Sequence, residues 1–278
     1  MLNIDIQSPA WSGQMEAILG ELQQLRESNA LLRERQTEID AQLSVAARVQ
    51  QSLTPRSLVW NDVSVETHYS PAHRIGGDFG IVFPHNDDVL TILMCDVSGH
   101  GIGPALMANR IYSEALRQLE REATPSDLLR CLHDFAHARI ATDGFYFTLA
   151  AVRLSMGGRW ATFAGGGHPP AMHVSDDGVR LLESQNGILG CFPETARRAP
   201  VEAIELAPGD RFVLYTDGLV EVFNCREDML GVEGLKTLVL QSAKQSLPEM
   251  RRAILDGVAA WGEGSLGDDV SLVIVEVR

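Results

Sequence analysis

The first regular pattern along the chain is a seven-residue repeat of mostly apolar positions. The positions that alternate three and four residues apart are Met15, Ile18, Leu22, Leu25, Asn29, Leu32, Gln36, Ile39, Leu43, Ala46, Gln50 and Leu53. Nine of these twelve are apolar, and a repeat sustained over more than five heptads is typical of a coiled coil. Asn29 falls at a core position, where a buried amide pair favours two helices in register. We therefore predict a coiled-coil helix over residues 14–54 and a homodimer through residues 15–53. The alternative is a lone amphipathic helix packed on its own domain.

The segments on either side of this helix differ in character. Residues 1–13 carry Pro9 and Gly13 without a periodic signal, so we expect an unstructured N-terminus. Pro55 ends the helix, because proline cannot continue an α-helix from its interior. Residues 55–278 contain no linker or low-complexity break and are interpreted as one domain.

Within residues 55–278, short strands come mostly in hairpins and the helices come in two clusters. Strands are predicted over Val63–Tyr69, Phe79–Pro84, Val89–Cys95, Phe145–Leu154, Arg159–Ala164, Met172–Val174, Val179–Leu182, Ala203–Leu206, Arg211–Tyr215 and Val270–Val277. Helices are predicted over Pro104–Arg121, Pro125–Ile140, Val232–Ser242 and Pro248–Ala260. This order indicates an α+β fold with antiparallel sheets, most simply two sheets packed together and flanked by helices.

Charge and cysteine usage narrow the functional classes. The formal net charge is −14, which argues against binding to nucleic acid or to an anionic membrane, since both need a basic face. No apolar run reaches the length of a membrane span and no signal-peptide pattern opens the chain, so we expect no membrane insertion. The four widely spaced cysteines form no C-x-x-C pair and indicate reduced thiols in a cytoplasmic protein.

Aspartate stands beside glycine in four places where a predicted strand meets a turn. These are Gly76-Gly77-Asp78, Asp96-Val97-Ser98-Gly99, Thr216-Asp217-Gly218 and Gly267-Asp268-Asp269. One such turn is ordinary, and its aspartate can simply cap the turn. If the strand ends converge, however, four carboxylates face one cavity, and they cannot crowd together unless a metal neutralises them or some hold protons. Oxygen-only ligands suit Mg²⁺ or Mn²⁺, and the absence of Cys/His spacing argues against zinc.

The chain resembles the metal-dependent PPM-type serine/threonine phosphatases, and within them the bacterial RsbU/SpoIIE-like group. The matching segments run in order as residues 46–55, Gly76-Gly77-Asp78-Phe79, 96–101, Gly167-His168-Pro169-Pro170, Pro208-Gly209-Asp210, 214–218 and 268–272. They span almost everything past the coil. The resemblance implies an α-β-β-α sandwich with two divalent cations, Mn²⁺ or Mg²⁺, in a cleft at one end.

The same resemblance implies a role for each aspartate. Asp78 would bridge both ions, Asp96 and the backbone carbonyl of Val97 would hold one, and Asp217 and Asp268 would hold the other. Two hard cations about 3.5–4 Å apart lower the pKa of a bridging water and clamp a phosphoryl group for in-line attack. Asp269 is interpreted as a residue that supports a ligand or the turn.

Two motifs depart from the group, and several other residues have two interpretations. Gly80 and Ile81 stand where Tyr-Asp is common, and Gly165-Gly166-Gly167 precedes His168 where Asn-Ala-Gly is usual; neither change removes a principal ligand. The remaining candidates are His100 as a general acid or a loop residue, His168 as a packing residue or a ligand, Arg74 as a phosphate contact or an exposed arginine, and Ser98 as a nucleophile, which lacks a triad context.

The sequence thus predicts a cytoplasmic phosphatase for phosphoserine or phosphothreonine in proteins. By resemblance, its substrate would be a phosphorylated STAS-type anti-sigma-factor antagonist in a partner-switching pathway. The coil and the Gln50–Pro55 segment would regulate it by positioning the Pro104–Arg121 helix, which follows Asp96 closely. Two alternatives remain: an inactive phosphatase-like binding module that recruits partners through the dimeric coil, and a hydrolase of small phosphate esters.

Overall fold

The computed structural model describes residues 9–51, 54–139, 144–193, 195–196, 200–264 and 267–278. It divides into two compact units, Met1–Arg48 and Val49–Arg278. The second unit carries all four candidate aspartates.

The first unit consists of most of helix α1 (Pro9–Gln51). The helix begins before the predicted start at residue 14, at a proline, which is favoured in a first turn because its missing N–H is not needed there. Residues 1–8 and Leu53 of the predictions lie outside the described residues. Several apolar side chains of the repeat are about half exposed in the single chain, including Leu22 (46%) and Leu25 (59%). The pairing of two such helices remains a prediction.

One antiparallel sheet, here called sheet B, begins just after Gly76-Gly77-Asp78. Its strands follow the order β3 (Phe79–Pro84), β4 (Val89–Val97), β5 (Phe147–Ser155), β6 (Trp160–Gly166) and β9 (Glu202–Glu205). Helices α2 (Ile102–Leu119) and α3 (Pro125–Arg139) cover its outer face. Their buried residues recur at helical spacing, as in Ala108, Ile111 and Ala115.

The other antiparallel sheet, sheet A, combines the strands closest to the start and to the end of the domain. Its order is β1 (Leu58–Trp60), β2 (Val63–Ser70), β11 (Val270–Val277), β10 (Arg211–Tyr215), β7 (Ala171–Ser175) and β8 (Gly178–Leu182). Helices α4 (Gly231–Ser242) and α5 (Leu247–Trp261) pack on its outer face.

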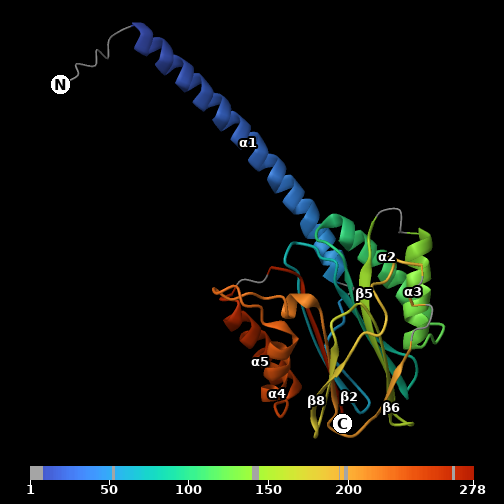
Figure 1. The fold of residues 1–278 in the computed structure, drawn as a ribbon. Helices are drawn as coiled ribbons and strands as arrows, with labels where there is room; N and C mark the ends of the chain where they lie inside the picture. Colours follow the sequence, from blue (N-terminus) through green and yellow to red (C-terminus); the bar gives the residue numbers. More distant parts are fainter. Residues whose placement is uncertain (1–8, 52–53, 140–143, 194, 197–199, 265–266) are drawn as a thin grey trace. The chain divides into compact units, whose positions relative to one another are not determined.

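Three apolar clusters hold these four layers together. One lies between α2–α3 and sheet B, one between the two sheets, and one between sheet A and α4–α5. Figure 1 shows the two helix pairs on opposite sides of the strands. The predicted α-β-β-α sandwich is therefore confirmed.

The strand pattern of the sequence recovers most elements but not all. The prediction omits β1, which has only three residues. Neighbouring β9 and β10 belong to different sheets, although Pro208-Gly209-Asp210 between them is typical of a tight turn. The helix predicted to reach Ile140 is described as far as Arg139, because Ile140 lies outside the described residues. None of the described helices is long and apolar enough to span a membrane.

Candidate metal centre

The strand register brings the four aspartates to the same end of the two sheets. In sheet B, Phe79 at the start of β3 pairs with Cys95 near the end of β4, which places Asp78 near Asp96. In sheet A, Tyr215 at the end of β10 pairs with Leu272 near the start of β11. Asp217 opens the short 3-10 helix η2 (Asp217–Leu219) after β10, and Asp268 precedes β11 by two residues. Each sheet thus contributes two of the predicted ligands.

Hydrogen bonds between the sheets join the two halves of the site at Asp78. Its Oδ2 atom accepts from the Thr216 hydroxyl at 2.7 Å and from the Ser271 hydroxyl at 2.8 Å. Both hydroxyls belong to sheet A or its edge, whereas Asp78 leads into sheet B. Asp78 is only 3% exposed, so its carboxylate is fixed between the sheets.

Burial and mutual repulsion raise the pKa values of several of the aspartates, as expected of crowded carboxylates. Burial, followed by the charge of Asp96, raises the pKa of Asp78 well above its ordinary value. Burial and the charges of Asp217 and Asp268 raise the pKa of Asp96 to about 7. Burial and the charge of Asp268 raise the pKa of Asp217 to about 6. A site that raises the pKa of several acids has an excess of negative charge, which a cation would neutralise.

The backbone carbonyl of Val97 lies against the turn that carries Asp78. A β-carbon on Gly77 would lie 2.4 Å from the Val97 oxygen, which is closer than two unbonded atoms can approach. Glycine at position 77 therefore allows the Asp78 turn and the predicted backbone ligand to sit side by side.

The side chain of Asp269 binds backbone groups of the same turn. Its carboxylate accepts hydrogen bonds from the N–H groups of Ala72 and Gly77, both at 2.9 Å. A β-carbon on Gly76 would overlap this carboxylate. Asp269 thus acts as the sequence suggested, as a support for the turn.

Gln50, which the sequence places in the coiled-coil repeat and in the matching segment 46–55, also contacts this turn. Its side-chain Oε1 accepts from the Gly76 N–H at 3.1 Å, and its Nε2 donates to the Gly76 carbonyl. Gln50 is 5% exposed. Its polar side chain at a core position of the repeat was a further signal, because a buried glutamine must find partners.

The donor chemistry of the site fits hard divalent cations. Carboxylate and carbonyl oxygens are the ligands that Mg²⁺ and Mn²⁺ prefer. Within the described ranges, no three His, Cys, Asp or Glu side chains are arranged closely enough to hold a metal ion. The four aspartates lie near one another, as their mutual effects on pKa show, and they come from two sheets.

The other candidates of the sequence occupy the rim or the interior. The ring of His100 contacts the ring of His73, with centroids 4.7 Å apart, and both residues are exposed, as is Arg74. Ser98 is tied into the loop, since its N–H donates to the Tyr146 carbonyl and its hydroxyl accepts from the Tyr146 N–H. His168 is buried and its Nδ1 lies 2.7 Å from the Thr148 hydroxyl.

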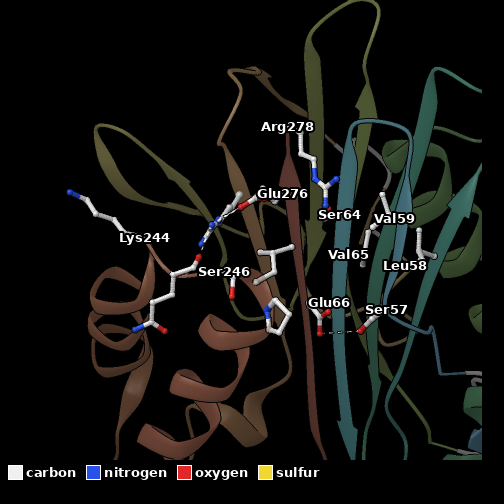
Figure 2. A pocket seen from close by; sticks show the side chains of 14 residues that line it. Ser57, Leu58, Val59, Ser64, Val65, Glu66, Lys244, Ser246, Glu276 and Arg278 are labelled. Atoms are coloured by element: carbon white, nitrogen blue, oxygen red, sulfur yellow. Dashed lines mark hydrogen bonds and ion pairs between the residues drawn. The ribbon is translucent and has the colours of Figure 1, made fainter.

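A separate groove of about 690 Å³ lies at the opposite ends of the sheet A strands. Figure 2 shows it between the β1–β2 hairpin and the start of α5, with Ser64, Glu276 and Ser246 among its lining residues. Ser64 is the second residue of β2 and Glu276 is the second-to-last residue of β11, whereas the aspartates lie where β2 ends and β11 starts. The groove is therefore not part of the candidate metal centre.

Two curated relatives are named phosphoserine phosphatases. The chain is 27% identical over 250 residues to phosphoserine phosphatase RsbU of Bacillus subtilis (strain 168), which covers 88% of this chain and 72% of RsbU. It is 23% identical over 184 residues to phosphoserine phosphatase RsbP of the same organism, which covers 65% of this chain. The chain spans 45% of the length of RsbP, so less than half of that relative is represented.

The fold and the sequence profile agree with these relatives. The SiaA-PP2C domain of Pseudomonas aeruginosa superposes with a TM-score of 0.78 at 22% identity, covering 87% of this chain and 98% of that domain. The profile of the family described as Stage II sporulation protein E (SpoIIE) matches residues 86–278. Because that match covers more than half of the chain, and the two-sheet sandwich is the fold of its solved neighbours, the chain belongs to the Stage II sporulation protein E family of PPM-type phosphatase domains.

Proposed function

We propose that this chain is a divalent-metal-dependent protein phosphatase that hydrolyses phosphoserine or phosphothreonine. The observation that carries the proposal is the convergence of Asp78, Asp96, Asp217 and Asp268 from two sheets onto one end of the sandwich. Family membership and phosphatase relatives support it, and one solved neighbour is a complex with magnesium.

The site would take two ions, Mn²⁺ or Mg²⁺. Asp78 would bridge them, Asp96 and the Val97 carbonyl would hold one, and Asp217 and Asp268 would hold the other. When bound, such ions supply an activated water and neutralise the charge of a phosphoryl group. The Thr216 and Ser271 hydroxyls orient the Asp78 carboxylate. Gly77, which has no β-carbon, allows the Val97 carbonyl to lie close to the turn that carries Asp78.

The substrate is proposed to be a phosphorylated protein, specifically a STAS-type anti-sigma-factor antagonist in a partner-switching pathway. RsbU and RsbP, both phosphoserine phosphatases, support this class of substrate. The chain would act in the cytoplasm as a homodimer paired through residues 15–53.

The test is an assay of the purified chain with Mn²⁺ and a serine-phosphorylated STAS protein. We expect phosphate release by the wild type and its loss in the Asp78→Asn and Asp217→Asn variants. Asp176→Asn, an exposed turn residue, is the matched control and should remain active. Activity that survives both site substitutions together would end the mechanism.

Two other results would favour the alternatives. Calorimetry that detects no Mn²⁺ binding to the wild type would favour an inactive binding module. Hydrolysis of p-nitrophenyl phosphate without hydrolysis of any phosphoprotein would favour a small-ester hydrolase.

A further inference from the structure

The spacing between the two sheets determines how the predicted ligands face one another. Asp78 and Asp96 belong to sheet B and its leading turn, whereas Asp217 and Asp268 flank strands of sheet A. A shift of one sheet against the other would change the distance between these pairs, even with every aspartate intact. Residues that fix the sheets together at this end therefore matter for the site.

The connection from β6 to β7 is the segment that crosses from sheet B to sheet A near this end, and it carries His168. Gly167 before it has a φ of +62°, and a β-carbon there would lie 2.7 Å from the Ile188 side chain. The Ser184 hydroxyl accepts from the His168 N–H at 3.1 Å and donates to its carbonyl at 2.7 Å. The backbone of His168 is thus held firmly.

The imidazole of His168 is hydrogen-bonded to sheet B and lies near the end of β10 in sheet A. In sheet B, its Nδ1 lies 2.7 Å from the hydroxyl of Thr148, which is the cross-strand partner of Asp96. Toward sheet A, the ring lies near the backbone of Tyr215, which stands two residues before Asp217, and its buried Nε2 makes no hydrogen bond among the described residues. The residue is 4% exposed, so the ring is enclosed at this end of the sheets.

We propose that His168 and Thr148 are a positioning pair that sets the separation of Asp96 from Asp217 for cation binding. Neither touches the phosphoryl group; both act through the aspartates. Burial lowers the pKa of His168 to about 4, so the ring is neutral at neutral pH and adds no positive charge beside a cation site. The inference rests on the proposed metal-dependent function.

The test measures Mn²⁺ affinity by calorimetry in the full chain, together with the Mn²⁺ concentration that gives half-maximal phosphatase activity. His168→Phe keeps the ring volume and removes the polar contact, and Thr148→Val is isosteric and removes the hydroxyl. We expect each to weaken Mn²⁺ binding about tenfold, in the range found when partners of metal ligands are removed. The turnover rate should recover at saturating Mn²⁺.

Two further variants separate positioning from general stability. His168→Asn can place an amide group near the position of Nδ1 and should restore most of the affinity. His173→Phe removes another buried histidine, whose Nε2 lies 3.1 Å from the Asp210 carboxylate. Asp210 is not one of the four candidate ligands, so Mn²⁺ affinity should be unchanged. The double variant Thr148→Val/His168→Phe should bind Mn²⁺ no more weakly than the single variant with the lower affinity, since both substitutions remove the same contact.

The outcomes distinguish the inference from the function beneath it. A wild type that binds no Mn²⁺ overturns both. A wild type that binds Mn²⁺, with Thr148→Val and His168→Phe binding equally well, overturns the positioning pair alone. An equal loss of affinity in His173→Phe also overturns the positioning pair, because the loss would then reflect a general loss of stability and not the position of His168.

Discussion

Gln50 and Gly76 are joined by two hydrogen bonds between a side-chain amide and a single residue's backbone. The amide oxygen accepts from the Gly76 N–H at 3.1 Å and the amide nitrogen donates to the Gly76 carbonyl. Gly76 is two residues from Asp78. The end of α1 is therefore tied directly to the turn that positions the proposed bridging ligand.

Replacing Gln50 by leucine should lower both stability and Mn²⁺ affinity. Two buried backbone groups of Gly76 would lose their partners, at about 1–3 kcal/mol for each unsatisfied group. Denaturant unfolding measures the first effect and calorimetry the second. Gln51→Leu is the matched control, because Gln51 is exposed; equal effects of the two substitutions would show that the bond to Gly76 is unimportant.

A methyl group at position 77 should damage the site without touching an aspartate. In Gly77→Ala the new β-carbon meets the Val97 carbonyl oxygen at 2.4 Å, so the turn or the carbonyl must move. We expect Mn²⁺ affinity to fall by about tenfold or more. In Gly187→Ala, an exposed position with its nearest contact at 3.8 Å, affinity should be unchanged. Wild-type affinity in Gly77→Ala would argue against Val97 as a ligand.

Asp96→Asn should stabilise the metal-free protein at high pH. The pKa of Asp96 is raised to about 7 when folded, against about 3.9 for an unfolded aspartate. The stability that the protonated form contributes is therefore present below pH 4 and lost as the pH rises through 7. Because asparagine stays neutral, the variant should be more stable to denaturant than the wild type at pH 8, by at most about 4 kcal/mol.

The pH dependence of that difference provides the check. With a chelator present, the stability advantage of Asp96→Asn should be near its full value above about pH 7 and shrink as the pH falls from 7 towards 4. Comparing the two proteins at each pH cancels the titration of the histidines they share. An advantage that is constant with pH would mean that charge at Asp96 is not its cause.

The dimer prediction rests on the apolar stripe of α1. Sedimentation of the wild type at micromolar concentration should give a dimer, whereas Leu22→Asp or Leu43→Asp should give a monomer, since a charge at a core position of the repeat opposes pairing. Gln24→Asp, off the core positions, should remain dimeric. A monomeric wild type would leave α1 as a single amphipathic helix.

The same variants test whether the coil regulates the active site. Loss of the dimer with unchanged turnover would count against the regulatory role. A changed turnover that disappears when Gln50→Leu is added would place the connection at Gly76 and not at α2.

Local patterns were enough to predict most of the fold because hairpin strands find their partners nearby in sequence. Val63–Ser70 and Val270–Val277 alternate or run apolar as strands should, yet their pairing across the whole domain is visible only in the structure. Each aspartate could be identified because it follows or precedes a strand beside glycine. Asp269 was interpreted correctly as a support of the turn, but two other contacts could not be predicted: Gln50 meets Gly76 across 26 residues and His168 meets Thr148 across 20. Such contacts depend on which distant segments the fold brings together, which no local pattern encodes.

The division of the aspartates between two sheets has a consequence for the life of the protein. A cation held by both sheets would cross-link them and bind only the folded chain, so folding and metal binding would be linked equilibria. In a chain synthesised when metal is scarce, the repulsion among the unneutralised aspartates would oppose the packing of the two sheets. Its resistance to cellular proteases would then rise and fall with the metal supply, and the amount of enzyme, as well as its activity, would report that supply.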